Sequence, residues 1–288
     1  MPLFGQIEGG RHMTYQQAEK KGEQLLQEAG IADAKIDAWL LLEMVAKIDR
    51  SFYFMHMNDD VEPEVLTEYE CVLEKRSEHI PLQYITGEQE FMGMTFKVNS
   101  NVLIPRQDTE TLVEEALKVI EPQMEVLDLC TGSGCILLSI LNNAPTVRGT
   151  GSDVSKQALL VAKENAKLHD LDAEWVRSNL FDNVSGHFDV IVSNPPYIAQ
   201  AELLTLMPEV GQFEPVQALD GGVDGLDFYR RITEEAPQYL KNNGYLFFEI
   251  GYDQGRAVHQ LMLDAGFSDV AVVKDLAGND RVVKGQIR

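Results

Sequence analysis

The sequence has little cysteine and little positive charge. Three of its 288 residues are cysteine, Cys71, Cys130 and Cys135. Because three is too few, and an odd number, for a disulfide framework, we expect a reducing, cytoplasmic environment. Lysine and arginine number 24 against 46 aspartates and glutamates, a formal net charge of −22. Such a chain repels phosphate backbones and anionic membranes. Since no basic cluster longer than a pair offsets this charge, we expect no direct nucleic-acid binding and no membrane partner.

Long apolar runs and metal-ligand patterns are also missing. No run approaches the roughly 18 apolar residues of a membrane helix, and the first ten residues lack the pattern of a secretion signal. Met13 could be the native start, so whether residues 1–12 are native stays open. The six histidines have no ligand spacing, which predicts no metal site. The remaining composition, 44% hydrophobic and 24% charged, is that of a globular protein with one large or two modest domains.

Residues 13–80 have helical spacing and predict a small all-α domain of three or four helices. Thr14 and Gln17 have the pattern of a capping box, Asp33 can cap a second helix, and a third is expected over Pro63–Ser77. The polar face of this domain is acidic. It is either a solvated helix surface or a docking face for a basic partner. Its residues are Asp59, Asp60, Glu62, Glu64, Glu68, Glu70 and Glu74.

Residues 81–105 predict a linker that contains a β-hairpin. Thr95–Asn99 alternates between apolar and polar residues, and Asn99–Asn101 is a turn signal before the apolar Val102–Ile104. We therefore expect these two segments to form the arms of the hairpin.

From residue 106 to residue 288, helices and strands alternate, which predicts a seven-stranded, mainly parallel sheet with helices on both faces. Ligands of such sheets bind at the carboxyl ends of the strands. The expected strands are Val126–Cys130, Arg148–Ser152, Glu174–Arg177, Val190–Ser193, Tyr245–Ile250, Asp269–Val273 and Arg281–Lys284. The expected helices are Thr109–Ile120, Cys135–Asn142, Ser155–His169, Asp227–Leu240 and Gln254–Ala265.

A glycine-rich loop follows the first of these strands. Gly132 and Gly134 allow the backbone to bend tightly and approach a ligand, and the helix that follows offers free N–H donors. Asp153 ends the next strand, where an acid can accept hydrogen bonds from both ribose hydroxyls of a nucleoside. The alternative is that Asp153 caps the helix that begins at Ser155.

Two positions indicate which nucleoside this loop binds. Leu137 stands where a dinucleotide fingerprint has a third small residue. Asp128, just before the loop, would repel a pyrophosphate but suits a cationic ligand such as the ammonium group of S-adenosylmethionine. The loop therefore favours a methyl-donor site over a nicotinamide site.

The segment Asn194-Pro195-Pro196-Tyr197 gives the strongest indication of chemistry. The prolines fix the backbone and remove two N–H donors. The Asn194 side-chain oxygen and the Pro195 carbonyl then form a rigid row of acceptors beside the Tyr197 ring. This row suits a planar NH₂ group, whose lone pair would face an electrophile, so that catalysis rests on positioning and electrostatics. The alternative is a proline turn that only terminates a strand.

These features together resemble an amino-methyltransferase of Rossmann-like class I. The flanking segments that narrow the resemblance are Leu103–Glu110, Ala218–Arg231, Glu249–Tyr252 and Asp275–Gly278. With them, the chain resembles the PrmC (HemK) family of peptide chain release factor glutamine methyltransferases, from its helical domain to its last strand.

The resemblance implies S-adenosylmethionine as cofactor. It also implies a substrate, the glutamine of the Gly-Gly-Gln motif of class-one release factors, methylated on its side-chain amide nitrogen. Asn194 and Pro195 would grip this amide, with Tyr197 packed against it. Asp153 would bind the ribose, the loop the methionine part, and Asn179-Leu180 would lie by the adenine. The implied cofactor-binding residues are Asp128, Cys130, Thr131, Gly132, Ser133, Gly134, Asp153, Asn179, Leu180 and Asn194.

Two residues depart from the pattern of this family. Cys130 stands where glycine is frequent, so its side chain must turn away from the donor or the loop must shift. Asn179 stands where aspartate is frequent, which keeps an acceptor for the adenine amino group but loses its charge. The family docks its substrate partly through the N-terminal helices, which favours the docking role of the acidic face. We expect a monomer.

Three further alternatives concern the chemistry and two side chains. A nucleic-acid methyltransferase acting on adenine or guanine would use the same row of acceptors, but the net charge argues against it. Glu249 could line the site or have a hydrogen-bonded structural role. Arg106 is expected to pair with Asp108 or Glu110.

Overall fold

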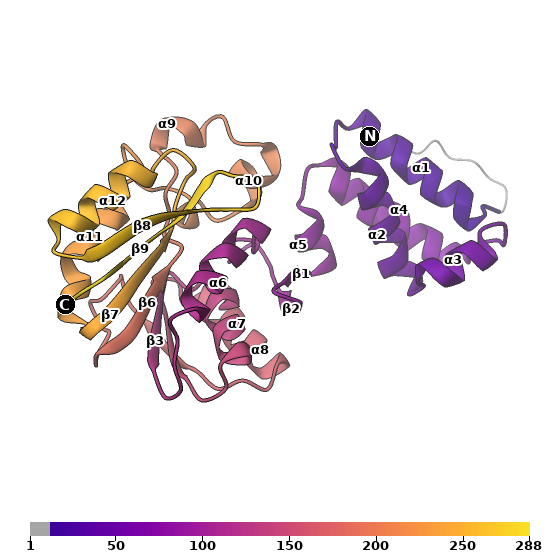
Figure 1. The fold of residues 1–288 in the computed structure, drawn as a ribbon. Coiled ribbons are helices and arrows are strands. Elements are labelled where there is room, and N and C mark those ends of the chain that lie inside the picture. The colour runs from indigo at the N-terminus through magenta and orange to yellow at the C-terminus, as the bar shows by residue number, and fades with distance from the viewer. Residues whose placement is uncertain (1–11) are drawn as a thin grey trace. The chain divides into compact units, whose positions relative to one another are not determined.

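The computed structural model describes residues 12–288, and its contacts divide the chain between Thr86 and Gly87 into two compact units. The question of whether residues 1–12 are native falls almost wholly outside the described part. We call residues up to Thr86 the helical unit and Gly87–Arg288 the sheet unit (Figure 1). None of the described helices is long and apolar enough to cross a membrane.

The helical unit contains more helices than its sequence predicts. The helices are α1 (Tyr15–Glu28), α2 (Ala34–Ala46), α3 (Arg50–His56), α4 (Pro63–Ser77) and α5 (Leu82–Thr86). The capping box of Thr14 and Gln17 is confirmed, with both of its hydrogen bonds formed. Asp33 is the N-cap residue of α2, as predicted, but its side chain makes no capping hydrogen bond. The missed α3 begins after Asp49, whose carboxylate accepts from the Phe52 N–H at 2.7 Å.

The acidic residues of the helical unit lie mainly at its surface. Asp59, Asp60 and Glu62 are exposed, as are the predicted acidic residues of α4, apart from Glu70. Glu70 is half-buried and pairs with Lys21 at 3.1 Å. The core below is apolar and includes Leu26, Trp39, Leu42, Tyr69 and Leu73.

A β-hairpin opens the sheet unit, but not with the predicted arms. Its strands are β1 (Glu88–Phe91) and β2 (Met94–Lys97), which pair in antiparallel register around Met92-Gly93. Both turn residues have positive φ, 51° and 70°, as a two-residue hairpin turn requires. Residues 102–104 form no strand. The Asn99–Asn101 turn signal misled the prediction because the glycine turn upstream fits the strand twist better.

The sheet has seven strands, as predicted. They are β3 (Glu125–Leu129), β4 (Arg148–Asp153), β5 (Glu174–Arg177), β6 (Phe188–Ser193), β7 (Leu240–Glu249), β8 (Ser268–Lys274) and β9 (Asp280–Gln286). Their order is β5-β4-β3-β6-β7-β9-β8, and β9 runs antiparallel to both of its neighbours. From β3 the chain adds β4 and β5 on one side, and then returns to add β6 and β7 on the other. This reversal of strand order leaves a crevice at the carboxyl ends of the parallel strands β3 and β6.

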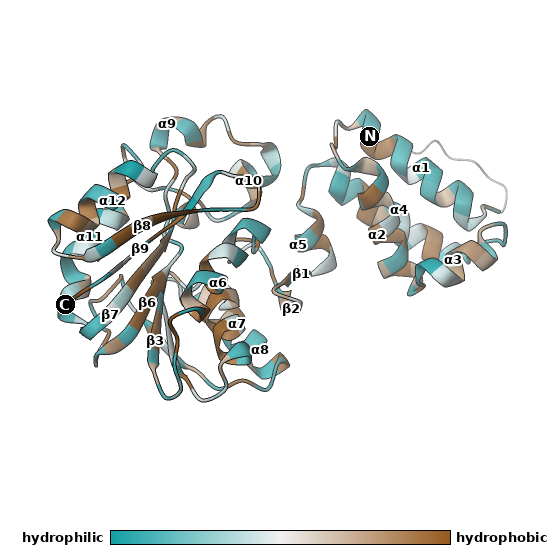
Figure 2. Ribbon diagram, in the orientation of Figure 1, coloured by the Kyte–Doolittle hydropathy of each residue, from teal (hydrophilic) through white to brown (hydrophobic). Residues whose placement is uncertain are grey.

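Helices cover both faces of the sheet (Figure 1). The helices α6 (Glu110–Leu117), α7 (Cys135–Asn143) and α8 (Lys156–Leu168) pack on one face, and α11 (Asp227–Glu235) and α12 (Gly255–Asp264) on the other. Figure 2 shows hydrophobic residues concentrated along β6 and α7, in agreement with the two apolar cores.

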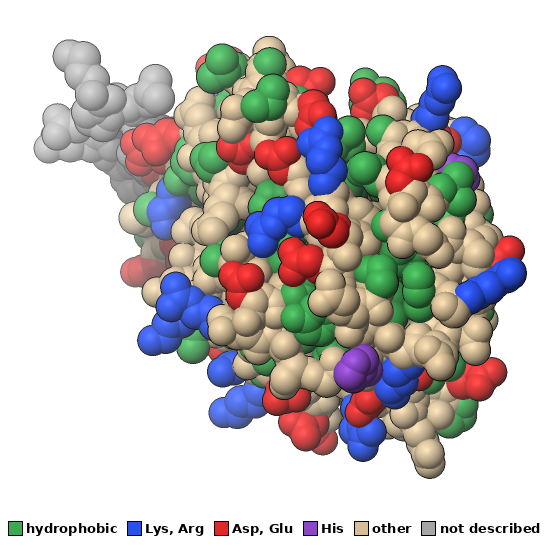
Figure 3. Space-filling model, turned by 90° about the vertical axis from the view of Figure 1, so that its left-hand side faces the viewer, with side chains coloured by type: hydrophobic (Ala, Val, Ile, Leu, Met, Phe, Trp, Pro, Cys, Tyr) green, Lys and Arg blue, Asp and Glu red, His purple; other side chains and the backbone are tan. Residues whose placement is uncertain are grey.

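Short helices that the sequence analysis did not predict follow β6. They are α9 (Gln200–Leu203), α10 (Pro208–Phe213) and the 3₁₀ turn η2 (Val216–Ala218); further 3₁₀ turns are η1 (Gln107–Thr109) and η3 (Ala236–Gln238). Elements of three to six residues are too short to show a helical period. On the face seen in Figure 3, acidic and basic side chains are interspersed.

Candidate active site

The glycine-rich loop makes a tight turn at the end of β3. Cys130, Gly132 and Gly134 all have left-handed backbone conformations, with φ of 61°, 57° and 81°. The Thr131 N–H donates to the Ser152 carbonyl at 3.0 Å, and the Gly134 N–H to the Thr131 carbonyl at 2.8 Å. These bonds hold the loop against β4 and start α7 directly behind it. The predicted strand–loop–helix arrangement is therefore present.

Gly134 is the glycine whose replacement this loop tolerates least. A Cβ at this position would lie 3.0 Å from the Trp175 ring and 3.2 Å from the Ala162 methyl group. We expect Gly134→Ala to lower the free energy of unfolding of the sheet unit by about 1–2 kcal/mol from backbone strain alone, and by more from this contact. Urea denaturation followed by circular dichroism measures the change.

Gly278→Ala is the matched control for this prediction. Gly278 has a similar φ of 86°, and its added Cβ would meet nothing within 4 Å. It therefore reports the backbone strain alone. Equal losses in the two variants would contradict a packing role for Gly134.

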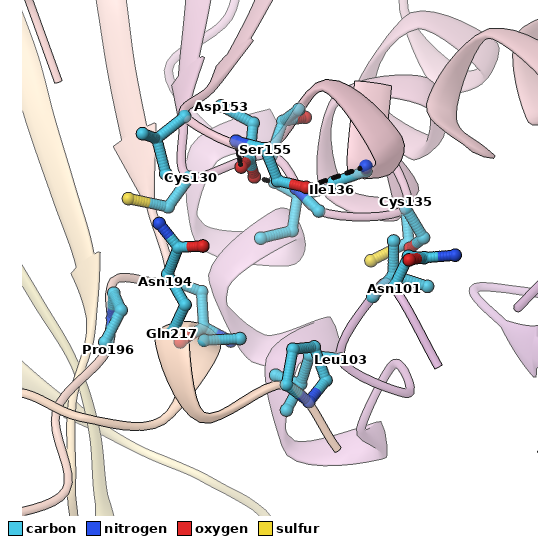
Figure 4. A pocket seen from close by; sticks show the side chains of 18 of the residues that line it. Asn101, Leu103, Cys130, Cys135, Ile136, Asp153, Ser155, Asn194, Pro196 and Gln217 are labelled. Carbon is cyan, nitrogen blue, oxygen red and sulfur yellow. Dashed lines mark hydrogen bonds between the residues drawn. The ribbon is translucent and has the colours of Figure 1, made fainter. Parts of the chain in front are cut away.

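Asp153 braces the loop from the end of β4. Its Oδ2 accepts from the Gly132 N–H at 3.0 Å and its Oδ1 from the Ser155 N–H at 2.8 Å. Burial raises the pKa of Asp153, against these backbone hydrogen bonds. The alternative that Asp153 caps α8 was wrong, because the cap is Ser155, whose hydroxyl accepts from the Ala158 N–H. The Asp153 side chain lines a cavity beside the loop (Figure 4).

This cavity brings most of the predicted site residues together. It measures about 1100 Å³ with its open mouth included, which accommodates a ligand the size of a nucleoside derivative. The predicted residues that line it are Cys130, Thr131, Gly132, Ser133, Asp153, Asn179, Leu180, Asn194 and Pro196. Four predicted residues are not part of its lining, namely Asp128, Gly134, Pro195 and Tyr197.

Asp128 lies behind the loop and is fully buried. The Thr131 hydroxyl donates to its Oδ2 at 2.5 Å, and Oδ1 has no hydrogen-bond partner among the described residues. Burial raises the pKa of Asp128 to about 7. The structure thus places this carboxyl against the underside of the loop, and not at the cavity wall where it would meet a bound ammonium group.

Asn194 stands where β6 leaves the sheet and lines the same cavity as Asp153 (Figure 4). The Ser193 hydroxyl before it donates to the Leu129 carbonyl at 2.8 Å, which ties the ends of β6 and β3 together. The Asn194 Nδ2 donates to the Thr109 hydroxyl at 3.5 Å. In Figure 4 the side-chain oxygen of Asn194 is turned toward the cavity.

The residues after Asn194 make a buried corner. Pro195 and Pro196 are buried, and Tyr197 is half-buried against the apolar core. The Tyr197 carbonyl accepts from Gln254 Nε2 at 2.9 Å, which fixes the chain after the two prolines. Burial also raises the pKa of Tyr197 to about 12. This phenol therefore stays protonated at neutral pH.

The two residues that depart from the family pattern both have partners of their own. The Cys130 side chain packs against the core on the α11 side of the sheet, and burial raises the pKa of its thiol. Asn179 is exposed; its Oδ1 accepts from Arg231 Nη1 at 3.2 Å, and its Nδ2 donates to Asp182 at 3.3 Å.

Sequence reasoning missed two walls of the cavity. One is the segment after the hairpin, with Asn101, Val102, Leu103, Pro105 and Arg106; the other follows α10, with Pro215, Gln217 and Ala218, and ends at Phe228. The signal was present, since both walls lie in or beside the flanking segments Leu103–Glu110 and Ala218–Arg231. Their position beside the cavity could not be predicted, because neither segment belongs to a helix or strand long enough to recognise from the sequence.

Arg106 joins these two walls through an ion pair with Glu214, whose side chain is buried. The predicted pairing with Asp108 or Glu110 was wrong. Asp108 instead pairs with Arg281 at 3.0 Å, and Glu110 accepts from the Met92 N–H at 2.7 Å. Among the residues 12–288, no three His, Cys, Asp or Glu side chains gather as metal ligands would.

Comparisons with known proteins identify the family of the chain. Residues 17–87 match the model of the PrmC N-terminal domain, and residues 106–209 match the methyltransferase small domain. A release factor glutamine methyltransferase from Geobacter sulfurreducens is 41% identical over 263 residues, 91% of this chain and 93% of the relative. One from Cereibacter sphaeroides is 42% identical over 264 residues, 91% and 94% of the two chains. The chain belongs to the release factor glutamine methyltransferase family.

A solved structure supports the fold independently. The crystal structure of a methyltransferase from Pyrococcus furiosus superposes with a TM-score of 0.51 at 16% identity, covering 67% of this chain and 89% of that one. The Rossmann-like methyltransferase fold and the resemblance stated from the sequence are both confirmed.

The protein is an enzyme that uses S-adenosylmethionine, and the cavity fits this cofactor. Asp153 offers a partly desolvated carboxylate for a ribose diol, and Val154, Leu180 and Phe228 offer apolar surface for a base. The glycines of the loop leave room for the rest of the molecule, since a Cβ at Gly132 would meet nothing within 4 Å.

Proposed function

We propose that this enzyme transfers a methyl group from S-adenosylmethionine to the side-chain amide nitrogen of the glutamine in the Gly-Gly-Gln motif of class-one peptide chain release factors. One observation carries the proposal: Asn194 and Pro196 line the same cavity as the glycine-rich loop and Asp153. A group that recognises an amide thus shares one cavity with a group that recognises a nucleoside. Relatives about 40% identical over most of the chain bear the name of this activity.

The bound cofactor supplies an electrophilic methyl group on a sulfonium. Asn194 Oδ1, at the cavity wall, accepts one proton of the substrate amide. The Pro195 carbonyl, which lies between the lining residues Asn194 and Pro196, accepts the other once the substrate enters this corner, and Tyr197 then packs against the amide. Because the Asn194 Nδ2 donates to the Thr109 hydroxyl, the Asn194 Oδ1 is available to accept a hydrogen bond from the substrate. The substrate nitrogen then presents its lone pair toward the donor, and its proton leaves for solvent after transfer. The chain contributes orientation and fixed dipoles, and no strong base is required.

The cofactor would be held by the residues around the loop. Asp153 would bind the ribose hydroxyls, the loop from Cys130 to Gly134 would hold the methionine part, and Asn179-Leu180 would lie by the adenine. In this arrangement Asp128 acts from behind the loop through Thr131. It holds the loop in place without touching the ligand.

A direct assay tests the proposed function. The enzyme, S-adenosylmethionine and a class-one release factor are incubated, and the factor is analysed by peptide mass spectrometry. We expect a single added methyl group on the glutamine of the Gly-Gly-Gln motif. Methylation of adenine or guanine in RNA or DNA, with none on the factor, would instead support a nucleic-acid methyltransferase.

We further propose that residues 13–80 dock the release factor, that residues 81–105 link this domain to the catalytic residues 106–288, and that the enzyme works as a cytoplasmic monomer. The exposed acidic residues of the helical unit, such as Asp59 and Glu64, offer a surface for a basic partner. The catalytic cavity itself lies wholly within the sheet unit.

Removing the helical unit tests its docking role. A chain starting at Gly87 should bind the whole release factor more weakly, while it methylates a short Gly-Gly-Gln peptide at a rate close to that of the full chain. Steady-state kinetics on both substrates measure the difference. Equal losses on factor and peptide would argue against docking, since they would indicate general damage to the sheet unit.

A further inference from the structure

Glu249 is a buried acid next to Asn194. The proposed mechanism gives this acid no role. It ends β7, which pairs in parallel with β6 in the register Ser193 with Phe248. Glu249 and Asn194 are therefore the next residues on two neighbouring strands. The Glu249 side chain is 1% exposed, and its Oε2 has no hydrogen-bond partner among the described residues.

Two site residues influence the ionisation of the Glu249 carboxyl. Burial raises the pKa of Glu249 to about 7, against the opposing influence of the Thr109 hydroxyl and the Asn194 amide. Thr109 is itself buried and lies within 3.5 Å of the Asn194 Nδ2. The Asn194 amide lowers this pKa only when it presents its nitrogen to the carboxylate, and the same nitrogen donates to Thr109.

The charged groups around Glu249 leave it without a dedicated counterion. Arg281 on β9 lowers its pKa, and Asp108 on η1 raises it. Arg281 is already committed to Asp275, to Asp108 and to the Ile250 carbonyl, at 3.0–3.3 Å. The other titratable groups that face this carboxyl are Tyr197, Tyr229 and Cys135.

Glu249 has no route to the substrate. It is not part of the cavity lining, whereas Thr109 and Asn194 are. It therefore cannot serve as a base for the methylated nitrogen, and any effect on the reaction passes through its neighbours.

We infer that Glu249 is a positioning residue: together with Thr109 it holds the side-chain nitrogen of Asn194, so that the oxygen stays turned to the cavity. A primary amide can present either end, and its two ends differ in chemistry. With nitrogen toward the cavity, Asn194 would oppose the NH₂ group of the substrate, donor against donor. A carboxylate beside the nitrogen also polarises the amide and strengthens its oxygen as an acceptor. The inference rests on the proposed function of Asn194.

Glu249→Gln tests this role with little change in volume. We expect kcat for the Gly-Gly-Gln peptide to fall roughly tenfold, as for other outer-shell partners of a reacting group, while the Kd of the cofactor stays unchanged. Glu115→Gln is the matched control. Glu115 is a buried acid of the same unit, paired with Lys118 and Lys284 and outside the cavity lining. Its replacement should leave kcat unchanged.

A second measurement separates positioning from a structural role. In an Asn194→Ala background, Glu249→Gln should cost nothing further, because the group it orients is gone. An equal loss in both backgrounds would overturn the inference. Should Glu249→Gln not fold, Thr109→Val replaces it: a fall in kcat that Thr109→Ser restores supports the inference, and an unchanged kcat overturns it.

The pH profile gives a third readout. The ionised carboxyl is the stronger acceptor for Asn194 and Thr109, so wild-type kcat should rise with pH through about 7 and fall on acidification. Glu249→Gln should lack this limb. If the wild-type enzyme does not methylate the peptide, the proposed function is refuted. If the wild type is active and Glu249→Gln has the same kcat and the same pH profile, only this inference is refuted.

Discussion

Asn194→Ala is expected to lower kcat for methyl transfer roughly 100-fold or more, the cost of deleting a preorganised polar contact to the reacting group. Asn194 supplies an acceptor from the rigid end of β6, fixed by the Ser193 bond to Leu129 and by Thr109. Without it, one proton of the substrate amide has no partner, and the nitrogen is no longer held in line with the methyl group. Single-turnover assays with radiolabelled donor measure the loss.

Cofactor affinity distinguishes this result from unfolding. Because the loop and Asp153 remain, Asn194→Ala should bind S-adenosylmethionine with nearly the wild-type Kd in calorimetry. Asn143→Ala serves as a control, since Asn143 ends α7 with a bond to the Ser139 carbonyl, away from the cavity. Unchanged turnover in Asn194→Ala would refute the proposed mechanism.

Asp153→Ala should weaken cofactor binding roughly 100-fold or more. Hydrogen bonds to a charged group contribute about 1.5–3 kcal/mol each, and a ribose diol offers two; 1.4 kcal/mol corresponds to a factor of ten. The substitution also leaves the Gly132 and Ser155 N–H groups without their acceptor, which loosens the loop. Calorimetric titration with S-adenosylmethionine measures the change.

Two further variants serve as controls for this prediction. Asp153→Asn keeps one acceptor oxygen and should lose less affinity than alanine does. Asp172→Ala removes an exposed acid of the same unit outside the cavity and should bind normally. A normal Kd in Asp153→Ala would show that the ribose is held elsewhere.

Much of the sheet unit could be predicted because its signals are local. Short runs rich in β-branched and aromatic residues mark strands, and Glu174–Arg177, with Trp175 and Val176 at its centre, was predicted with its observed bounds. The helix after the loop was also predicted, beginning at Cys135. In the helical unit, α4 has its predicted bounds, Pro63–Ser77, since a proline favours its first turn.

The errors have two causes, a contact between distant segments and an ambiguous pairing of short neighbouring strands. The partner of Arg106 is Glu214, more than a hundred residues away, and no local spacing points to it. The β2 strand pairs with residues before it and not with Val102–Ile104. The signal for pairing is weak in short strands, because several registers satisfy the same alternation.

The sequence by itself determined the kind of protein: an acidic α/β methyltransferase with a glycine-rich loop, an acid at the end of β4 and a proline-locked asparagine at the end of β6. The loop, the acid and the asparagine are each a property of a few consecutive residues, set by backbone sterics. Only the tertiary structure decided which side chains face the cavity. It placed Asp128 behind the loop and Asn194 in front of it, and it set Glu249 beside Asn194. The reason is physical: side-chain direction at the carboxyl end of a strand depends on the register and twist of the whole sheet, and packing across many elements fixes both.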